Sequence, residues 1–195
     1  MRNRFYLLSI LSVLVVSLMS GCASWRQSLQ STGNIDVAID NCITDFCHTS
    51  RLRKAGDIFD ILYFEESPDL YKIVIMVAHD KVYPVSDKGS DPKDPGIPNR
   101  YRICGDKLFY WSIPEDVIPD EMIGILQRYD HIDLDWRATY YDLPPYTIDD
   151  GALVIRYYVC RDDLTNYKKW NYRHIVKHRF LRRRNPPTIR CRTER

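Results

Sequence analysis

Apolar and polar side chains alternate along several short stretches of this chain, which is the pattern of half-buried β-strands. Residues 58–64 and 71–78 are two such stretches, and the charges and proline of 65–69 between them suit a hairpin loop. The stretches 107–112 and 152–160 are rich in aromatic and β-branched side chains, which also favour strands. The pattern predicts a sheet that contains these four strands.

A helical pattern starts at Pro119, because proline suits the first position of a helix. Asp120 and Glu121 follow, where the helix dipole favours negative charge. Apolar side chains then recur with helical spacing at Met122, Ile125, Leu126 and Tyr129. We therefore predict one main helix at about 119–130. Strands with one main helix among them indicate an α+β fold with a largely antiparallel sheet.

Composition divides the chain into four parts. Residues 1–21 are an apolar leader, and 22–50 are expected to form a tether with a small cysteine loop, because 23–34 offer few large apolar side chains. Residues 51–179 contain the predicted strands and helix, and they suffice for one globular α+β domain. Residues 180–195 form a basic C-terminal tail, in which two prolines prevent a continuous helix.

The leader begins with two arginines in its first four residues and continues without a charged side chain from Phe5 to Met19. These 15 residues reach about 22 Å as a helix, less than the roughly 30 Å hydrocarbon core of a bilayer. A signal segment therefore fits better than a permanent transmembrane helix. Ser20 and Gly21 then supply small side chains before the thiol of Cys22.

The segment from Met19 to Cys22 resembles the lipobox of bacterial lipoprotein signals, although Met19 stands where that pattern usually has leucine. The resemblance implies that Cys22 is lipidated and that cleavage makes it the first residue of a membrane-anchored protein. Ala23 after the cysteine implies delivery to the outer membrane, so we expect a lipoprotein of the cell envelope. The alternatives are an ordinary secretory signal with Cys22 just beyond the cut, and an uncleaved anchor.

The net charge of +2 hides a strong asymmetry along the chain. Residues 22–167 carry 15 Lys and Arg against 25 Asp and Glu, whereas 168–195 carry 11 basic residues against one acidic residue. Such asymmetry is typical of a surface that meets a charged partner, here anionic lipid, lipopolysaccharide or an acidic envelope protein. Export argues against nucleic acid, and the alternative is a tail that only improves solubility. The candidate binding residues are Arg179, Arg182, Arg183, Arg184, Arg190 and Arg192.

Five cysteines lie beyond the proposed lipid attachment site, so at least one stays free or pairs between chains. In an oxidising envelope we expect disulfides, and the predicted pairs are Cys42 with Cys47 and Cys104 with Cys160. Cys42, Cys47 and His48 also allow a covalent haem, with two thioethers and an adjacent histidine ligand. We favour the disulfide and expect no cofactor.

His131, Asp133 and Asp135 lie at alternate positions, so on an extended chain they share one face. Imidazole and carboxylate groups in this arrangement can bind a divalent metal or act as acid and base. The favoured alternative is a half-buried segment whose Ile132 and Leu134 face the core, which the same alternation predicts.

Common motifs of hydrolases and nucleotide-binding proteins are missing from the sequence, among them G-x-S-x-G, G-x-x-x-x-G-K-[ST] and G-x-G-x-x-G. We therefore expect a membrane-anchored envelope lipoprotein that binds a partner or has a structural role, without catalysis. The alternative is a periplasmic enzyme for metal-assisted hydrolysis that uses His131, Asp133 and Asp135.

Overall fold

The computed structural model of this chain describes residues 24–79, 81–82, 97–114, 117–134, 154–171 and 188–191. Three α-helices are present in these residues: α2 (Ser24–Gln27), α3 (Ile35–Thr49) and α4 (Glu121–Arg128). A short 3₁₀ helix, η1 (Arg51–Lys54), follows α3. The strands are β1 (Ile58–Ser67), β2 (Leu70–Val77), β3 (Arg100–Cys104), β4 (Lys107–Trp111), β5 (Val154–Cys160) and β6 (Tyr167–Asn171).

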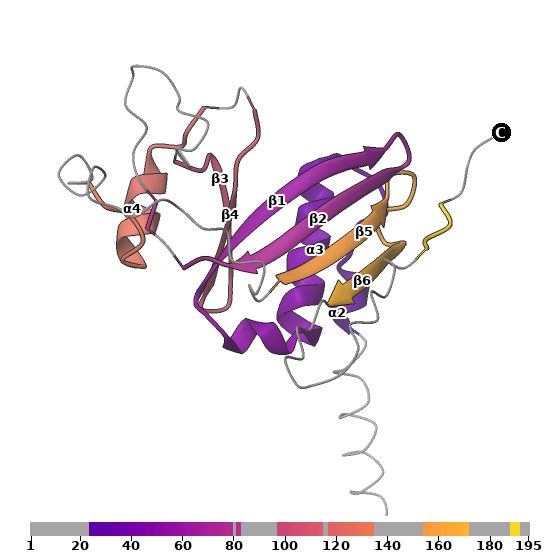
Figure 1. Cartoon of the computed structure of the whole chain (residues 1–195), viewed down its shortest axis with the longest axis horizontal. Coiled ribbons are helices and arrows are strands. Elements are labelled where there is room, and N and C mark those ends of the chain that lie inside the picture. Colours follow the sequence, from indigo (N-terminus) through magenta and orange to yellow (C-terminus); the bar gives the residue numbers. More distant parts are fainter. Residues whose placement is uncertain are drawn as a thin grey trace, which may run out of the picture.

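The six strands form one mixed sheet in the order β3-β4-β1-β2-β5-β6 (Figure 1). All neighbouring pairs are antiparallel except β1 and β4, which run parallel. This confirms the predicted α+β fold with a largely antiparallel sheet. The strands predicted from alternation correspond to β1, β2, β4 and β5, and the helix predicted at about 119–130 corresponds to α4.

Helix α3 covers one face of the sheet (Figure 1). Asn34 caps its start, where the side-chain oxygen accepts a hydrogen bond from the Val37 amide at 3.3 Å. The fully buried apolar side chains of the helix recur with helical spacing and are Ala38, Ile39, Cys42, Ile43 and Phe46. Phe46 packs edge-on against Phe59 and Phe109 of the sheet, at centroid distances of 4.9 and 5.5 Å. Helix α3 is therefore part of the main hydrophobic core.

The prediction of a tether at 22–50 is wrong for the residues that the structure describes there. The Asn41 side chain fastens the segment that precedes α3, because it accepts from the Gln30 amide at 3.1 Å and donates to the Gln30 carbonyl at 2.7 Å. It also donates to the Leu164 carbonyl at 3.2 Å, which links this segment to the turn between β5 and β6. Among the described residues the folded body thus already includes α2, well before the predicted boundary at residue 51.

A second, smaller core lies where α4 packs on the sheet face opposite α3, over β4. Its buried members are Val82, Leu108, Tyr110, Met122, Ile125, Leu126 and Ile132. Pro119 starts the turn into α4, since its carbonyl accepts from the Met122 amide at 2.9 Å. Because α4 reaches only this edge of the sheet, β1, β2, β5 and β6 have no described helix over their second face (Figure 1).

Cations and aromatic rings meet as cross-strand neighbours on that second face. Phe64 on β1 lies opposite Lys72 on β2, and the Lys72 ammonium is 5.4 Å from the ring centroid. Arg156 on β5 lies opposite Trp170 on β6, and its guanidinium is also 5.4 Å from the ring. Such pairs stabilise the sheet by up to about 1 kcal/mol each at exposed sites.

No helix among the described residues is both long and apolar enough to cross a bilayer.

Candidate functional site

Helix α2 and η1 lie together at the C-terminal end of α3. The Trp25 indole of α2 stacks on the His48 ring, with centroids 5.4 Å apart and planes 9° from parallel. At the same helix end, the Arg53 guanidinium of η1 donates to the Cys47 carbonyl. Ser50 makes the junction, because its amide donates to the Phe46 carbonyl at 2.9 Å and its hydroxyl accepts from the Leu52 amide at 3.1 Å. Helix α2 and η1 therefore contact the same end of α3, and their exposed residues form the α2–η1 surface.

This α2–η1 surface is strongly basic. Its defining residues are Trp25, Arg26, Arg51, Arg53 and Lys54, and all four cations are exposed. Residues 46–56 contain no Asp or Glu. Among the described residues, these four side chains form no ion pair with a carboxylate. The Arg26 guanidinium lies 5.4 Å from the Trp25 ring centroid, so an amphipathic ring and a charge are presented side by side.

Around the β5–β6 hairpin, by contrast, carboxylates of the fold pair with the basic side chains. Asp45 of α3 is 4% exposed, and its Oδ2 lies 2.7 Å from the Lys169 ammonium. The same oxygen accepts from the Tyr157 hydroxyl at 2.8 Å and from the Thr49 hydroxyl at 3.1 Å. Burial, with Asp45 nearby, raises the pKa of Tyr157 well above its usual value, so this hydroxyl remains a donor. The cluster fastens α3 to β5 and β6.

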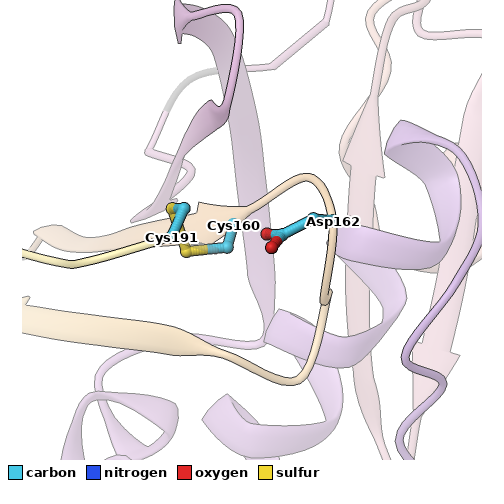
Figure 2. Close-up of side chains that lie close together, drawn as sticks. All are labelled: Cys160, Asp162 and Cys191. Carbon is cyan, nitrogen blue, oxygen red and sulfur yellow. A yellow bond between two sulfur atoms is a disulfide. The ribbon is translucent and has the colours of Figure 1, made fainter. Parts of the chain in front are cut away.

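Cysteine pairing differs from the prediction. Cys160, at the end of β5, is bonded to Cys191, with an S–S distance of 2.07 Å and a Cα–Cα distance of 5.4 Å. The predicted bond between Cys104 and Cys160 is therefore wrong. Asp162 follows β5, and its carboxylate lies near the disulfide (Figure 2). One oxygen of Asp162 and both sulfur atoms lie within 4.8 Å of one another, but sulfurs joined in a disulfide are not the thiolates that a metal requires.

The predicted pair of Cys42 and Cys47 is also wrong, because both residues lie on α3. Residues five apart on a helix are separated by about 7.5 Å along the axis and about 140° around it. Cys42 points into the main core and is fully buried, whereas Cys47 is only partly buried. His48 stacks on Trp25 instead. The three residues proposed for a haem therefore point in different directions from one helix.

His131 is buried and contacts the second core. Its Nε2 lies 3.1 Å from the Tyr110 hydroxyl, and its carbonyl accepts from the Val82 amide at 2.8 Å. The Asp133 amide donates to the Val82 carbonyl at 3.1 Å, so the segment pairs with residue 82. Ile132 faces the core as expected, but Leu134 is 52% exposed. Among the described residues, His131 and Asp133 belong to no group of three candidate metal ligands, and Asp135 lies outside those residues, so the metal-assisted hydrolase alternative stays a prediction.

Arg190 is the one predicted basic binding residue that the structure describes. It is exposed, its carbonyl accepts from the Asn166 side chain at 3.3 Å, and the next residue is Cys191 of the disulfide. Lys168 also donates to the Thr188 carbonyl. The segment 188–191 is therefore fastened to the β5–β6 hairpin. The predicted site residues that lie outside the described ranges are Cys22, Asp135, Arg179, Arg182, Arg183, Arg184 and Arg192.

Sequence reasoning missed both the α2–η1 surface and the Asp45 cluster. The sequence did contain a signal for the α2–η1 surface, because the basic stretch Arg51-Leu-Arg-Lys54 follows residues without carboxylates. The second had no local signal, since Lys169 lies 124 residues from Asp45.

Comparison of the chain with protein-family models, with curated proteins and with solved structures finds no match.

Proposed function

We propose that this chain is a bacterial envelope lipoprotein, anchored through Cys22, that acts by binding rather than by catalysis. In this proposal its α2–η1 surface rests on an anionic bilayer. The observation that carries it is the start of the folded body: α2 begins at Ser24, two residues after the cysteine of the lipobox-like segment. The residue after that cysteine, Ala23, favours the outer membrane as the site of attachment.

The short connection restricts where the body lies once Cys22 carries lipid. Two residues span at most about 7 Å, so Ser24 is held at the level of the lipid headgroups. Trp25 comes next, and tryptophan is enriched at this level because its ring is apolar while its N–H is polar. The α2–η1 surface is therefore the part of the body closest to the bilayer.

Charge makes the same surface suitable for anionic lipid. Arg26, Arg51, Arg53 and Lys54 are exposed, and each basic residue near an anionic membrane contributes about 1 kcal/mol. Phosphate groups are strong acceptors for arginine, which can donate two parallel hydrogen bonds to one phosphate. A lipid chain and a polybasic surface are together the two signals that stable anchoring requires.

Lipidation is tested by metabolic labelling with a palmitate analogue. We expect label on the wild-type protein and none on Cys22→Ala, which is released into the soluble fraction if it is cleaved at all. A matched control is Cys42→Ala, because it removes a thiol that is fully buried in the core. Wild-type protein that takes up no label contradicts the proposal.

A further inference from the structure

Helix α3 and strand β3 bring two thiols together. Arg102 of β3 joins the two elements, since its Nη1 lies 3.1 Å from the Asp40 carboxylate and its Nη2 donates to the Thr44 hydroxyl at 3.0 Å. Cys47 lies three residues beyond Thr44, on the same side of the helix. Cys104 lies two residues beyond Arg102, on the same face of the strand. Cys47 and Cys104 are therefore the next residues along the interface that Arg102 forms between α3 and β3.

Cys47 and Cys104 both pack against the main core, and they lie close enough for each thiol to shift the pKa of the other through a side-chain hydrogen bond. Each is partly buried, so the pair remains within reach of a partner from solvent. They are not bonded to each other in the structure. A disulfide between α3 and β3 requires that the two Cα atoms lie about 4.4–6.8 Å apart.

The environment makes the two thiols unequal. The hydrogen bond from Cys47 lowers the pKa of Cys104 to about 7, and the nearby Arg102 guanidinium adds to this effect against the opposing effect of burial. The same hydrogen bond, together with burial, raises the pKa of Cys47. Cys104 is thus the more acidic of the two thiols and is partly ionised at neutral pH, and a thiolate is the species that attacks a disulfide.

We propose that Cys47 and Cys104 are a redox dithiol that closes into a second disulfide, between α3 and β3. The need for an oxidising compartment rests on the proposed export to the envelope. The oxidant is a disulfide donor, such as oxidised glutathione or an oxidised protein dithiol. With this pair closed and Cys160 bonded to Cys191, the odd cysteine is Cys42, which is fully buried in the core.

The exchange proceeds in two steps. The Cys104 thiolate attacks one sulfur of the donor disulfide, the donor S–S bond breaks, and the leaving thiolate takes a proton from water. The Cys47 thiol then loses its proton to solvent and attacks the Cys104 sulfur of the mixed disulfide, which expels the second donor thiolate. Two thiols of this chain are oxidised, and one donor disulfide is reduced to two thiols.

Peptide mapping without reduction tests the proposal on the full mature chain, incubated with oxidised and reduced glutathione at several ratios and then alkylated. Trypsin leaves Cys42 and Cys47 on one peptide, because no Lys or Arg lies between Arg26 and Arg51. Cys42→Ala therefore identifies which thiol is linked. We expect the 27–51 peptide joined to the peptide that contains Cys104, in wild type and in Cys42→Ala alike.

The native Cys160–Cys191 bond is the internal control for oxidation in the same digest. Cys47 and Cys104 that remain alkylated as free thiols while this control is oxidised overturn the proposal, and so does a bond from either to a different cysteine. These outcomes are independent of palmitate labelling, so a failure here leaves lipidation at Cys22 as a separate question.

The rate of alkylation of Cys104 as a function of pH supplies a second readout. We expect wild-type Cys104 to react with a midpoint near pH 7, whereas in Cys47→Ala the midpoint shifts upward because the stabilising hydrogen bond is gone. Cys42→Ala should leave the midpoint unchanged. An unchanged midpoint in Cys47→Ala contradicts the assigned roles of the two thiols.

Discussion

The α2–η1 surface and the β5–β6 hairpin are both basic, but they differ in whether carboxylates pair with their basic side chains. In the hairpin, Lys169 pairs with Asp45 at 2.7 Å and Arg161 pairs with Glu65 at 3.4 Å. On the α2–η1 surface, Arg51 and Lys54 are exposed and meet no carboxylate among the described residues. Charges that the fold neutralises contribute to folding, whereas charges left in water remain available for a partner.

The disulfide and the α2–η1 surface lie toward opposite ends of α3, whereas Lys169 of the hairpin reaches the C-terminal end, where it donates to Thr49. Helix α3 begins near Leu164, whose amide donates to the Ser31 carbonyl at 2.8 Å, and it ends where His48 stacks on Trp25. Its 15 residues extend about 22 Å. The disulfide at Cys191 lies beside the first end, and the α2–η1 surface lies at the second. A bilayer at the α2–η1 surface therefore leaves the disulfide end of the body facing away.

The largest expected effect comes from opening the disulfide that fastens residues 188–191 to the hairpin. Replacing Cys160 and Cys191 with alanine removes a bond between residues 31 apart in sequence, and we expect a loss of about 3–4 kcal/mol in the free energy of unfolding. Chemical denaturation measures this. Wild-type protein reduced before unfolding is the control, and it should lose a similar amount if the bond rather than side-chain packing is responsible.

Breaking the Asp45 cluster should lower the free energy of unfolding slightly less than opening the disulfide does. Lys169→Met leaves a buried carboxylate without its cation, and we expect a loss of about 3 kcal/mol, at the lower end for a broken buried pair because the Lys169 side chain is 25% exposed. The matched substitution on the α2–η1 surface, Arg51→Met, should change the free energy of unfolding by less than about 0.5 kcal/mol. Equal losses from the two variants would remove the distinction between the regions.

Binding to anionic vesicles, unlike the free energy of unfolding, should depend on the α2–η1 surface. The mature chain made without the leader and with Cys22→Ser keeps every described element, and it should bind vesicles that contain anionic lipid. Arg51→Gln, Arg53→Gln and Lys54→Gln together should weaken this binding about 100-fold, since each basic residue contributes about 1 kcal/mol. Co-sedimentation at rising salt measures the effect, and salt should weaken the wild-type binding by screening.

The matched control for this experiment removes the same charge elsewhere, from Lys72, Lys81 and Arg128. Lys72 and Lys81 already pair with Glu66 and Asp130, at 3.5 and 3.2 Å. We therefore expect this variant to bind vesicles within a few-fold of the parent chain. Equal weakening by the two triple variants indicates attraction by net charge alone and contradicts a specific docking surface.

The smallest expected effect concerns Asp60, a carboxyl of β1 that belongs to neither region. Burial raises its pKa to about 6, against the opposing hydrogen bond from the Ile61 backbone. The folded state thus holds a proton that the unfolded state releases near pH 4, so stability decreases as pH rises from about 4 to about 6 and then levels off. Asp60→Asn should remove this decrease and stabilise the protein at pH 7 by roughly 1–2 kcal/mol.

Denaturation at pH 4.5 and pH 7 measures that difference, with Asp57→Asn as the control because Asp57 is exposed and pairs with Lys107. If Asp60→Asn does not stabilise the protein at pH 7, burial is not what perturbs this carboxyl.

Local patterns in the sequence predicted the elements whose partners are near in the chain. The hairpin of β1 and β2 followed from alternation around a charged loop, and α4 followed from Pro119 and the spacing of Met122, Ile125 and Leu126. Strands β3 and β6 were missed because they are short and carry cations such as Arg102 and Lys169, which do not resemble half-buried positions.

Helix α3 was missed although its apolar repeat is visible at Ile35, Ile39, Ile43 and Phe46. Asn, Asp, Thr and β-branched residues lower its intrinsic helix propensity, and the cysteine spacing suggested a loop instead. Packing against the sheet decides the outcome. The pairing of Cys160 with Cys191 and of Asp45 with Lys169 could not be predicted, because each depends on strand order rather than on sequence distance.

Fluorescence of the lipidated protein in vesicles with brominated acyl chains tests directly whether the α2–η1 surface lies on the bilayer. Trp25 lies in this surface and Trp170 on the second face of the sheet, while the other tryptophans are unchanged in both variants. We predict that brominated lipid quenches the wild type and Trp170→Phe equally and quenches Trp25→Phe much less. Quenching that survives Trp25→Phe and is lost in Trp170→Phe would place the sheet, not α2, against the membrane.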